Sequence, residues 1–340
     1  MIAIIFFIFG LVLFVSLFPM KFSLVQKILM ILLGIIFILV AGFREGDVTN
    51  DYIVYLSFWN QSDLEGVVEL SFIWLRDILR HQLLLPPVYL FLTFATLGVG
   101  TKIYAINKLS IYPFLALLIY VGHYYILHEL TQIRIGVSSG FFLIAINYKV
   151  KKKIYHTLFF LILAFFFHYS AVIGIILFLL NNKNSKFYYF LIPLGYVIFF
   201  FNNKLNISIP IPYVQQKMEA YQEMKKWGVG DEINVFNFVF LVRILLLYIL
   251  FFYAKRISVY NENVYLLLKI YAISLFSFLF LSDIPAFSFR IQEFLGIVEI
   301  ILLPLIAVIF RNKSFGKLFV ILIAIGFIFI DIFYNKYIFK

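Results

Sequence analysis

Long apolar runs recur from one end of the 340-residue chain to the other. A helix needs about 20 apolar residues to cross a bilayer, with a range of roughly 17–25. Runs of about this length or somewhat shorter lie near 2–18, 28–43, 86–103, 111–127, 132–148, 154–167, 170–180, 187–201, 236–254, 264–281, 294–310 and 318–334. Because lipid offers no partners to backbone polar groups, these runs favour helices. The sequence predicts an all-α, polytopic transmembrane bundle of about 12 spans, with 1–340 forming one integral membrane domain.

Composition leaves almost no room for a soluble domain. Hydrophobic residues make up 64% of the chain and charged residues 13%. A soluble domain carries roughly 25% charged residues, so lipid must cover the remaining surface. The absence of cysteine excludes disulfides, thiolate metal sites and cysteine nucleophiles. No GxxxxGK[ST] loop, HExxH or DxD pair occurs in the sequence, so no nucleotide motor, metal or other cofactor is predicted.

The basic residues, which dominate a formal net charge of +11, fall mainly in alternate connections between the apolar runs. One set of connections contains Lys21, Lys27, Lys102, Lys108, Lys149, Lys151, Lys152, Lys153, Lys183, Lys186, Lys255, Arg256, Arg311, Lys313 and Lys317. The positive-inside rule places this set in the cytoplasm and both termini outside. The other set includes two long outer loops, 44–85 and 202–235. The charge therefore indicates topology, and no nucleic-acid partner is predicted.

The segment 154–180 has two interpretations. One tilted helix of 27 residues would be about 40 Å long at 1.5 Å per residue, and it would move the basic connections that follow to the outer side. Two half-helices that meet at 167–170 keep those connections inside, and this hairpin is the favoured prediction. Irregular backbone at membrane depth is tolerated where it lines a cavity or packs within protein. The hairpin therefore places His168 at the floor of an outward-facing cavity.

Two outer segments have amphipathic helical patterns. In 69–85 the spacing places Glu69 and Arg80 on one face, opposite Phe72 and Leu79. The segment 213–227 has a similar pattern. Such helices either wall a groove above the bilayer or pack at its interface. The pattern alone does not choose between these roles.

Charged residues and one histidine on the outer side form a short set: Arg44, Glu45, Asp47, Asp51, Glu129, Arg134, His168, Arg243, Asp283, Arg290 and Glu293. A charge at the bilayer centre costs roughly 2.5–3.5 kcal/mol on insertion scales, so each should face a cavity or a partner. Arg134 follows Glu129 by five residues, and a structural ion pair between them is the simplest explanation. Arg243 lies within a long apolar run and needs an internal anion, either a protein carboxylate or a ligand phosphate.

Several arginines on one side favour a polyanionic ligand over a single carboxylate. Arginine binds phosphate oxygens bidentately and keeps its charge. A neutral His168 beside them could accept a proton or donate a hydrogen bond to phosphate. A structural role explains each residue equally well when it is taken alone. The joint placement of Arg134, His168, Arg243 and Arg290 favours a site.

Three segments resemble the EpsG family of polysaccharide polymerases. AGFREGDVTNDYIVYLSFW (41–59) resembles the R-x-G-x-x-x-DY-x-x-Y region that follows an early span in that family. HELTQIRIGVSSGFFLIAI (128–146) resembles its x-x-x-R-x-x-x-A helix, and FFFHYSAVIGIILFLL (165–180) resembles its F-H-x-S-A block. The three occur in the family's order, and 41–59 is followed by a stretch that begins with Glu69, also a feature of the family.

The resemblance implies a Wzy-type O-antigen or exopolysaccharide polymerase of a bacterial inner membrane, with a metal-independent, GT-C-like fold. Such enzymes transfer a growing glycan from undecaprenyl pyrophosphate onto an incoming lipid-linked repeat unit, on the outer (periplasmic) face. A chain-length regulator is a frequent partner. The main alternative is a transporter or flippase for the same lipid-linked oligosaccharide, which would need access from both leaflets and commonly shows repeat symmetry. A non-catalytic subunit of the assembly machinery is a third interpretation.

For the polymerase interpretation, preorganised arginines would stabilise the charge of the departing pyrophosphate. Four are predicted to bind it, two as a clamp and two in support: Arg134 and Arg290, then Arg44 and Arg243. The preferred base or orienting residue is His168. Three carboxylates are its rivals: Asp51, Glu129 and Glu293.

Overall fold

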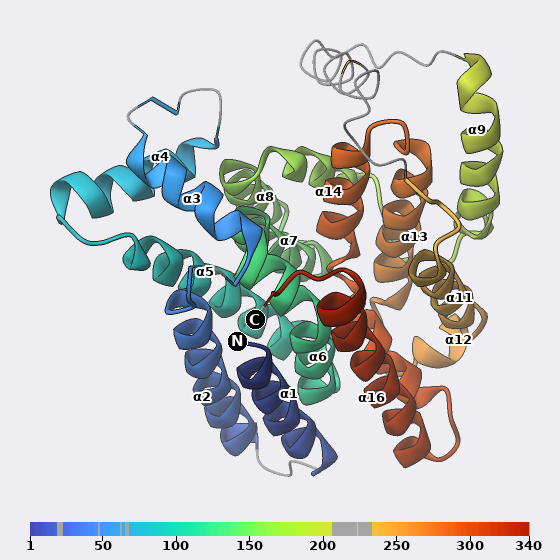
Figure 1. The fold of residues 1–340 in the computed structure, drawn as a ribbon. Coiled ribbons are helices and arrows are strands. Elements are labelled where there is room, and N and C mark those ends of the chain that lie inside the picture. The colour runs from blue at the N-terminus through green and yellow to red at the C-terminus, as the bar shows by residue number, and fades with distance from the viewer. Residues whose placement is uncertain are drawn as a thin grey trace.

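The computed structural model describes residues 1–18, 23–46, 48–61, 63–64, 68–205, 223 and 233–339, and every regular element in these ranges is a helix (Figure 1). Here α marks an α-helix and η a 3₁₀- or π-helix. The N-terminal third contains α1 (Ile2–Leu17), α2 (Ser23–Gly42), α3 (Asn50–Asn60), α4 (Leu70–Asp77), η1 (Ile78–Gln82) and α5 (Val88–Leu109). The middle third contains α6 (Pro113–Ile119), η2 (Tyr120–Thr131), α7 (Ile133–Val150), α8 (Ile154–Phe167), η3 (Tyr169–Phe178), η4 (Lys186–Phe190) and α9 (Leu191–Leu205). The C-terminal third contains α11 (Phe238–Phe252), α12 (Ala254–Ile257), α13 (Val264–Phe280), α14 (Pro285–Gly296), α15 (Glu299–Leu302), η5 (Leu303–Val308), α16 (Lys313–Phe329) and η6 (Ile330–Tyr334).

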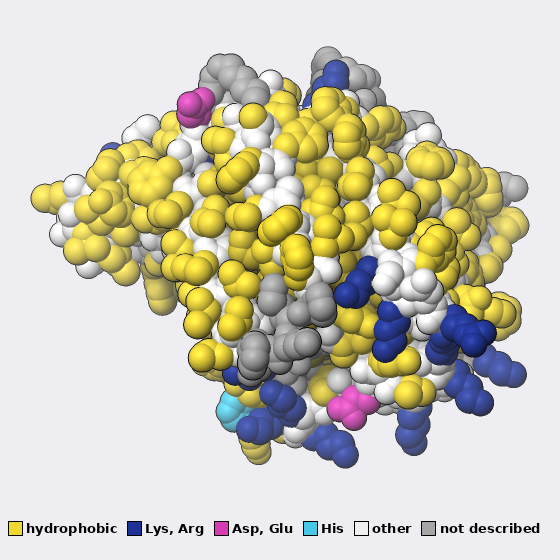
Figure 2. All heavy atoms as spheres, turned by 90° about the horizontal axis from the view of Figure 1, so that it is seen from below, with side chains coloured by type: hydrophobic (Ala, Val, Ile, Leu, Met, Phe, Trp, Pro, Cys, Tyr) yellow, Lys and Arg dark blue, Asp and Glu magenta, His cyan; other side chains and the backbone are white. Residues whose placement is uncertain are grey.

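The lengths and surfaces of these helices fit a lipid environment. Among the described residues, six helical stretches are long and apolar enough to cross a membrane: Leu24–Gly42, Val88–Leu109, Pro113–Thr131, Ile133–Val150, Pro285–Val308 and Lys313–Tyr334. Shorter apolar helices accompany them, among them α1, α8 and α13. Hydrophobic side chains cover most of the face seen in Figure 2. The chain is a multi-pass, all-helical membrane protein, and the total of about 12 spans remains a prediction.

Both termini lie on the same side of the bundle as the segment that follows α2, as the alternation of charge predicts. Met1 borders a cavity together with Arg44 and Val48. The backbone N–H of Phe339 donates to the carbonyl oxygen of Val48 at 3.1 Å. Figure 1 shows the two ends of the chain next to each other. This side corresponds to the predicted outer side.

The connections predicted to be cytoplasmic meet one another at the other side. Asn261 donates to the carbonyl oxygen of Leu109 at 3.2 Å, and Lys269 donates to that of Asn181 at 2.9 Å. Figure 2 shows Lys and Arg side chains gathered along one edge of the molecule. Turns that the positive-inside rule assigns to one side are therefore neighbours in the fold.

The segment 154–180 is a hairpin, as predicted. Helix α8 ends at Phe167, His168 adopts an extended conformation (φ −157°, ψ 124°), and η3 turns back along α8. Gly174 lies so close to α8 that an added Cβ would stand 2.9 Å from Leu161 Cδ2. In a continuous helix these two residues would be about 20 Å apart. The hairpin places His168 at its turn.

The predicted start of the span after the turn 282–293 is wrong, and this changes the predicted position of two candidate site residues. The last part of the predicted turn 282–293 is helical, because α14 begins at Pro285 and the helical stretch continues to Val308. Proline is favoured in the first turn of a helix, where its missing N–H costs nothing. Arg290 and Glu293 therefore lie on a helix, one turn apart.

The amphipathic stretch 69–85 is helical from Leu70 to Gln82, as predicted, but two of its charged residues lie inside the protein. Glu69 and Arg76 are buried, whereas Leu70 and Trp74 are more than half exposed. The helix thus turns an apolar surface outward and supplies charged groups to the interior. The segment 213–227 and most of the loop 202–235 lie outside the described residues.

Candidate functional site

Arg134 is held at the start of α7 by the carboxylate of the residue that precedes α4. The backbone breaks at Gln132 (φ −86°, ψ 62°), so that Arg134 stands in the first turn of α7. Its Nη1 forms an ion pair with Glu69 Oε2, and its Cζ lies 5.9 Å from the centre of the Tyr55 ring. Arg134 Nε is buried and has no hydrogen-bond partner among the described residues. The guanidinium is thus fixed by protein on one edge and keeps an N–H for a ligand.

His168 approaches the same carboxylate from the hairpin turn. Its Nδ1 accepts a hydrogen bond from the backbone N–H of Ser170 at 3.1 Å, and its Nε2 lies 3.9 Å from Glu69 Oε1. A neutral imidazole has one donor and one acceptor nitrogen, so the proton resides on Nε2. In this arrangement Nε2–H is the group of the His168 ring that can donate a hydrogen bond.

Asp51, in the first turn of α3, is surrounded by positive charge. Burial raises the pKa of its carboxyl above the usual value near 4, and the charges of Arg134, Arg290 and Arg44 oppose that rise. Arg134 and Arg290 also act electrostatically on His168. Arg290 itself is exposed on α14. Three of the four predicted pyrophosphate ligands are therefore close enough to act electrostatically on one carboxylate.

Arg44 is buried and has two unused donors. Its Nη1 donates to the carbonyl oxygen of Ala41 at 2.5 Å, and its Cζ lies 4.5 Å from the centre of the Phe91 ring. Burial lowers the pKa of this guanidinium to about 10, so it stays charged at neutral pH. Its Nε and Nη2 have no hydrogen-bond partner in the described part of the chain. We refer to Arg44, Asp51, Glu69, Arg134, His168 and Arg290 as the arginine site.

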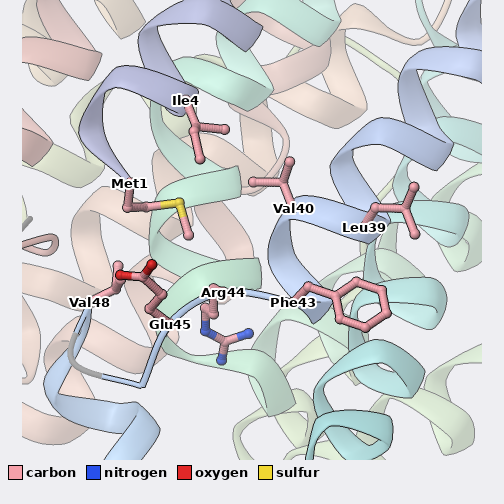
Figure 3. Close-up of a pocket in the computed structure, with 8 residues that line it drawn as sticks. All are labelled: Met1, Ile4, Leu39, Val40, Phe43, Arg44, Glu45 and Val48. Carbon is pink, nitrogen blue, oxygen red and sulfur yellow. The ribbon is translucent and has the colours of Figure 1, made fainter.

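A mostly apolar cavity of about 330 Å³ adjoins Arg44. It lies between the facing ends of α1 and α2, as Figure 3 shows, and Glu45 also borders it. The apolar lining consists of Met1, Ile4, Leu39, Val40, Phe43 and Val48. One end of the arginine site is therefore open toward apolar surface.

Glu129 is not part of this site, and the predicted pair of Glu129 with Arg134 is wrong. Lys102 Nζ lies 2.6 Å from Glu129 Oε1, and both side chains are almost fully buried. Tyr120 donates to the same oxygen at 3.0 Å. Gly98 leaves room for this carboxylate, because a Cβ there would overlap it. Lys102 is thus an internal ion-pair partner and not a residue of a cytoplasmic connection.

Arg243 belongs to a second cluster. Its Nε lies 3.3 Å from Glu299 Oε1, and its Nη2 lies 2.7 Å from His123 Nε2. His123 Nδ1 lies in turn 2.6 Å from Asp331 Oδ2. Of the two anions that the sequence allowed for Arg243, the structure provides the protein carboxylate.

The second cluster lines another cavity of about 330 Å³, which we call the second cavity. Glu293 faces it together with His123, Arg243 and Asp331. The side chain of Gln132, two residues before Arg134, lies close enough to interact with the Glu293 carboxyl. The second cavity and the arginine site are therefore neighbours: both include residues of α14, and Gln132, beside Glu293, immediately precedes α7.

Comparison with known proteins identifies the family. The EpsG family model matches residues 27–339. This chain belongs to the EpsG family. EpsG proteins form a Wzy-type polymerase family, so this member is a membrane protein of the polysaccharide-polymerase type. No curated protein and no solved structure matches the chain.

The family's three motif segments meet at the arginine site of this EpsG protein. Segment 41–59 supplies Arg44 and Asp51, segment 128–146 supplies Arg134, and segment 165–180 supplies His168. Glu69, which links Arg134 and His168, was missed as a site residue because the pattern of 69–85 was interpreted only as an amphipathic helix above or at the bilayer interface. One sequence signal could have identified Glu69: an acidic residue also begins the stretch that follows the first of these segments in the family.

Two further carboxylates of this EpsG protein were also missed. Glu299 and Asp331 lie within predicted spans, and both are at most 1% exposed. An acid inside an apolar run is itself a sign of a buried partner. Applying that rule to 294–310 and 318–334 would have indicated a second polar cluster.

Proposed function

We propose that this protein is a glycosyltransferase that polymerises undecaprenyl-pyrophosphate-linked repeat units on the outer face of a bacterial inner membrane. The observation that carries the proposal is the meeting of the three EpsG motif segments at one cluster of arginines. The product would be O-antigen or exopolysaccharide. A chain-length regulator of the same pathway is the expected protein partner.

The arginine site suits the pyrophosphate of the donor. Arg44 offers two nitrogens without a hydrogen-bond partner, Nε and Nη2, and Arg134 offers one, Nε, counted over the described residues. Arg290 is exposed, and its charge acts on both Asp51 and His168. Fixed guanidinium groups stabilise negative charge as it develops on a leaving group, so the proposed reaction needs no metal. The cavity between α1 and α2 would receive the first apolar carbons of the lipid.

The proposed reaction is a single displacement at the anomeric carbon of the donor. An acceptor hydroxyl oxygen attacks that carbon, and the bond from the carbon to the pyrophosphate oxygen breaks. The electron pair and the negative charge leave with the lipid pyrophosphate, while the hydroxyl proton passes to Asp51. His168 donates from Nε2 to a pyrophosphate oxygen.

The contacts of the four candidate bases support Asp51 as the proton acceptor and His168 as a hydrogen-bond donor. Asp51 is half-buried and surrounded by the arginines. Glu129 is held by Lys102, and Glu293 belongs to the second cavity. The acceptor nitrogen of His168 is already occupied by a backbone N–H. We therefore assign proton acceptance to Asp51 and hydrogen-bond donation to His168.

Glycan ladders from a strain that lacks this gene test the proposal. A polymerase defect should leave single repeat units on the lipid core and remove long polymer. Expression of the parent chain from a plasmid should restore the ladder. A strain with no repeat units at all would indicate the flippase alternative, and an unchanged ladder would contradict a role in polymerisation.

A further inference from the structure

The second cavity has the chemistry of a binding site, yet the proposed reaction does not use it. It is lined by residues of η2, α11, α13, α14, α16 and η6, by residues just before α11, and by the C-terminal residues after η6. Its volume of about 330 Å³ lies at the lower end of the range of roughly 300–1,000 Å³ that is typical of small-molecule sites. A site of this size suits one or two sugar rings.

The charges of the second cavity disfavour a second pyrophosphate. Arg243 is its one described arginine, and that arginine is engaged by Glu299. Asp331 and Glu293 add two more carboxylates. A polyanion would meet more negative than positive charge here. The ligand is therefore neutral or cationic.

Two buried groups in this cavity are unsatisfied. Gln292 and Glu293 both line it, and they are only 3% and 6% exposed. Gln292 Nε2 and Glu293 Oε2 have no hydrogen-bond partner among the described residues. Buried polar groups are normally paired. The cavity thus offers one free donor and one free acceptor from adjacent residues.

A hydroxyl-rich ligand matches this pair, because each hydroxyl both donates and accepts. Asn237 and Asn335 also line the cavity. Phe289 borders it and is 45% exposed, so its ring can cover an apolar face of a ligand. Amide groups, one free carboxylate oxygen and an aromatic ring together match a neutral sugar.

The position of the cavity fits a substrate shared with the arginine site. Gln132 is close enough to interact with Glu293 and is two residues from Arg134. The C-terminal segment that lines the cavity is tied to Val48, three residues before Asp51. We propose that the second cavity binds a sugar of the acceptor repeat unit through Gln292, Glu293 and Phe289. This inference rests on the proposed function, since it assumes a lipid-linked saccharide substrate.

A binding experiment tests the inference with the full-length protein in nanodiscs. The probe is the oligosaccharide released by mild acid from the lipid-linked units that the deletion strain accumulates, so it lacks lipid and pyrophosphate. Binding is measured by calorimetry. Glu293→Gln, which removes the charge of the acceptor, should raise the Kd by at least about tenfold, the scale of a charge-assisted hydrogen bond. Phe289→Ala, a change at a partly exposed position, should also raise it measurably. Glu262→Gln, the same change at an exposed residue on the opposite side, should leave Kd unchanged.

The outcomes separate this inference from the function on which it rests. Normal binding by both Glu293→Gln and Phe289→Ala would overturn the sugar site and leave the polymerase proposal standing. The same holds if the parent protein fails to bind the released oligosaccharide. A deletion strain that accumulates no lipid-linked units would overturn both proposals together. Weakened binding in both variants, with thermal stability retained in Phe289→Ala, supports the site.

Discussion

The arginine site and the second cavity are built from the same residue types but differ in how these are paired. Arg44 and Arg134 keep N–H groups without partners in the described structure, whereas Arg243 is held between Glu299 and His123. The difference indicates where a ligand charge is needed. Free guanidinium donors await an anion, while an arginine already paired with carboxylate balances buried charge.

The two histidines differ in the same way. His168 accepts a backbone N–H at Nδ1, so its proton is on Nε2. Arginine can only donate, so His123 accepts at Nε2 from Arg243 and its Nδ1–H donates to Asp331. One imidazole therefore presents a donor toward the arginine site, and the other is fully used by protein. Local hydrogen bonds, and not residue type, decide which histidine can serve a substrate.

Replacing Arg134 tests the anion side of this comparison and should have the largest effect. Arg134→Ala removes a fixed positive charge from the leaving group, and polymer formation should fall by about 10³–10⁵-fold, as for other arginines that stabilise phosphoryl charge. The measurement is the glycan ladder, with the amount of protein in the membrane as control. Arg134→Lys keeps the positive charge but lacks the paired N–H donors of arginine, so it should retain a small part of the polymer formation that Arg134→Ala loses. A full ladder from Arg134→Ala would remove this residue from the site.

Asp51→Asn should lower polymer formation by about 10²–10⁴-fold, the usual contribution of a general base. The parent enzyme should lose activity as pH falls through the raised pKa of Asp51, because the base must be deprotonated. The residual activity of the variant should lack this decline on the acid side. Rates from purified protein in nanodiscs over a range of pH provide the test. An acid-side decline that persists in Asp51→Asn would assign the base elsewhere.

Arg243→Ala should instead damage stability, which separates the two regions. The change leaves Glu299 buried without its cation, and breaking such a pair typically costs about 3–5 kcal/mol. Thermal unfolding in detergent and membrane protein levels should both fall. The double variant Arg243→Ala with Glu299→Gln should recover part of the loss, because no unpaired charge remains. If Arg243→Ala kept normal stability but lost polymer formation, Arg243 would again be a candidate ligand of the pyrophosphate.

The features that were predicted well from the sequence depend on properties of single segments, namely the length of apolar runs and the positions of basic residues between them. Apolar run length gave most of the helices, and the positions of lysines favoured the 154–180 hairpin, which Gly174 and Leu161 confirm by their contact. Hydrophobicity and the positive-inside rule act on each segment almost independently of the rest of the fold. They also placed Arg134, His168 and Arg44 correctly on one side.

Partners across helices were harder to predict, because pairing depends on depth and rotation of two helices at once. Glu129 is near Arg134 in sequence, yet its cation is Lys102 on α5. Arg134 pairs with Glu69 on another segment. Hydropathy assigned Lys102 to a loop because a long lysine near a span end commonly reaches water. In this fold the close packing of α5 and α7 buries it instead.

His168 provides the finest test of the comparison, since its role depends on one proton. If Nε2–H donates to the leaving group, His168→Ala should lower polymer formation by about 10²-fold, the lower range for losing one such donor. His168→Gln can still donate from its amide and should be clearly more active than His168→Ala. If His168 acted as the base, this difference would disappear. Glutamine cannot accept the proton at neutral pH, so both variants would be equally inactive. Comparing the two rates in nanodiscs, with the hairpin's integrity checked by thermal unfolding, therefore distinguishes a donor from a base at this position.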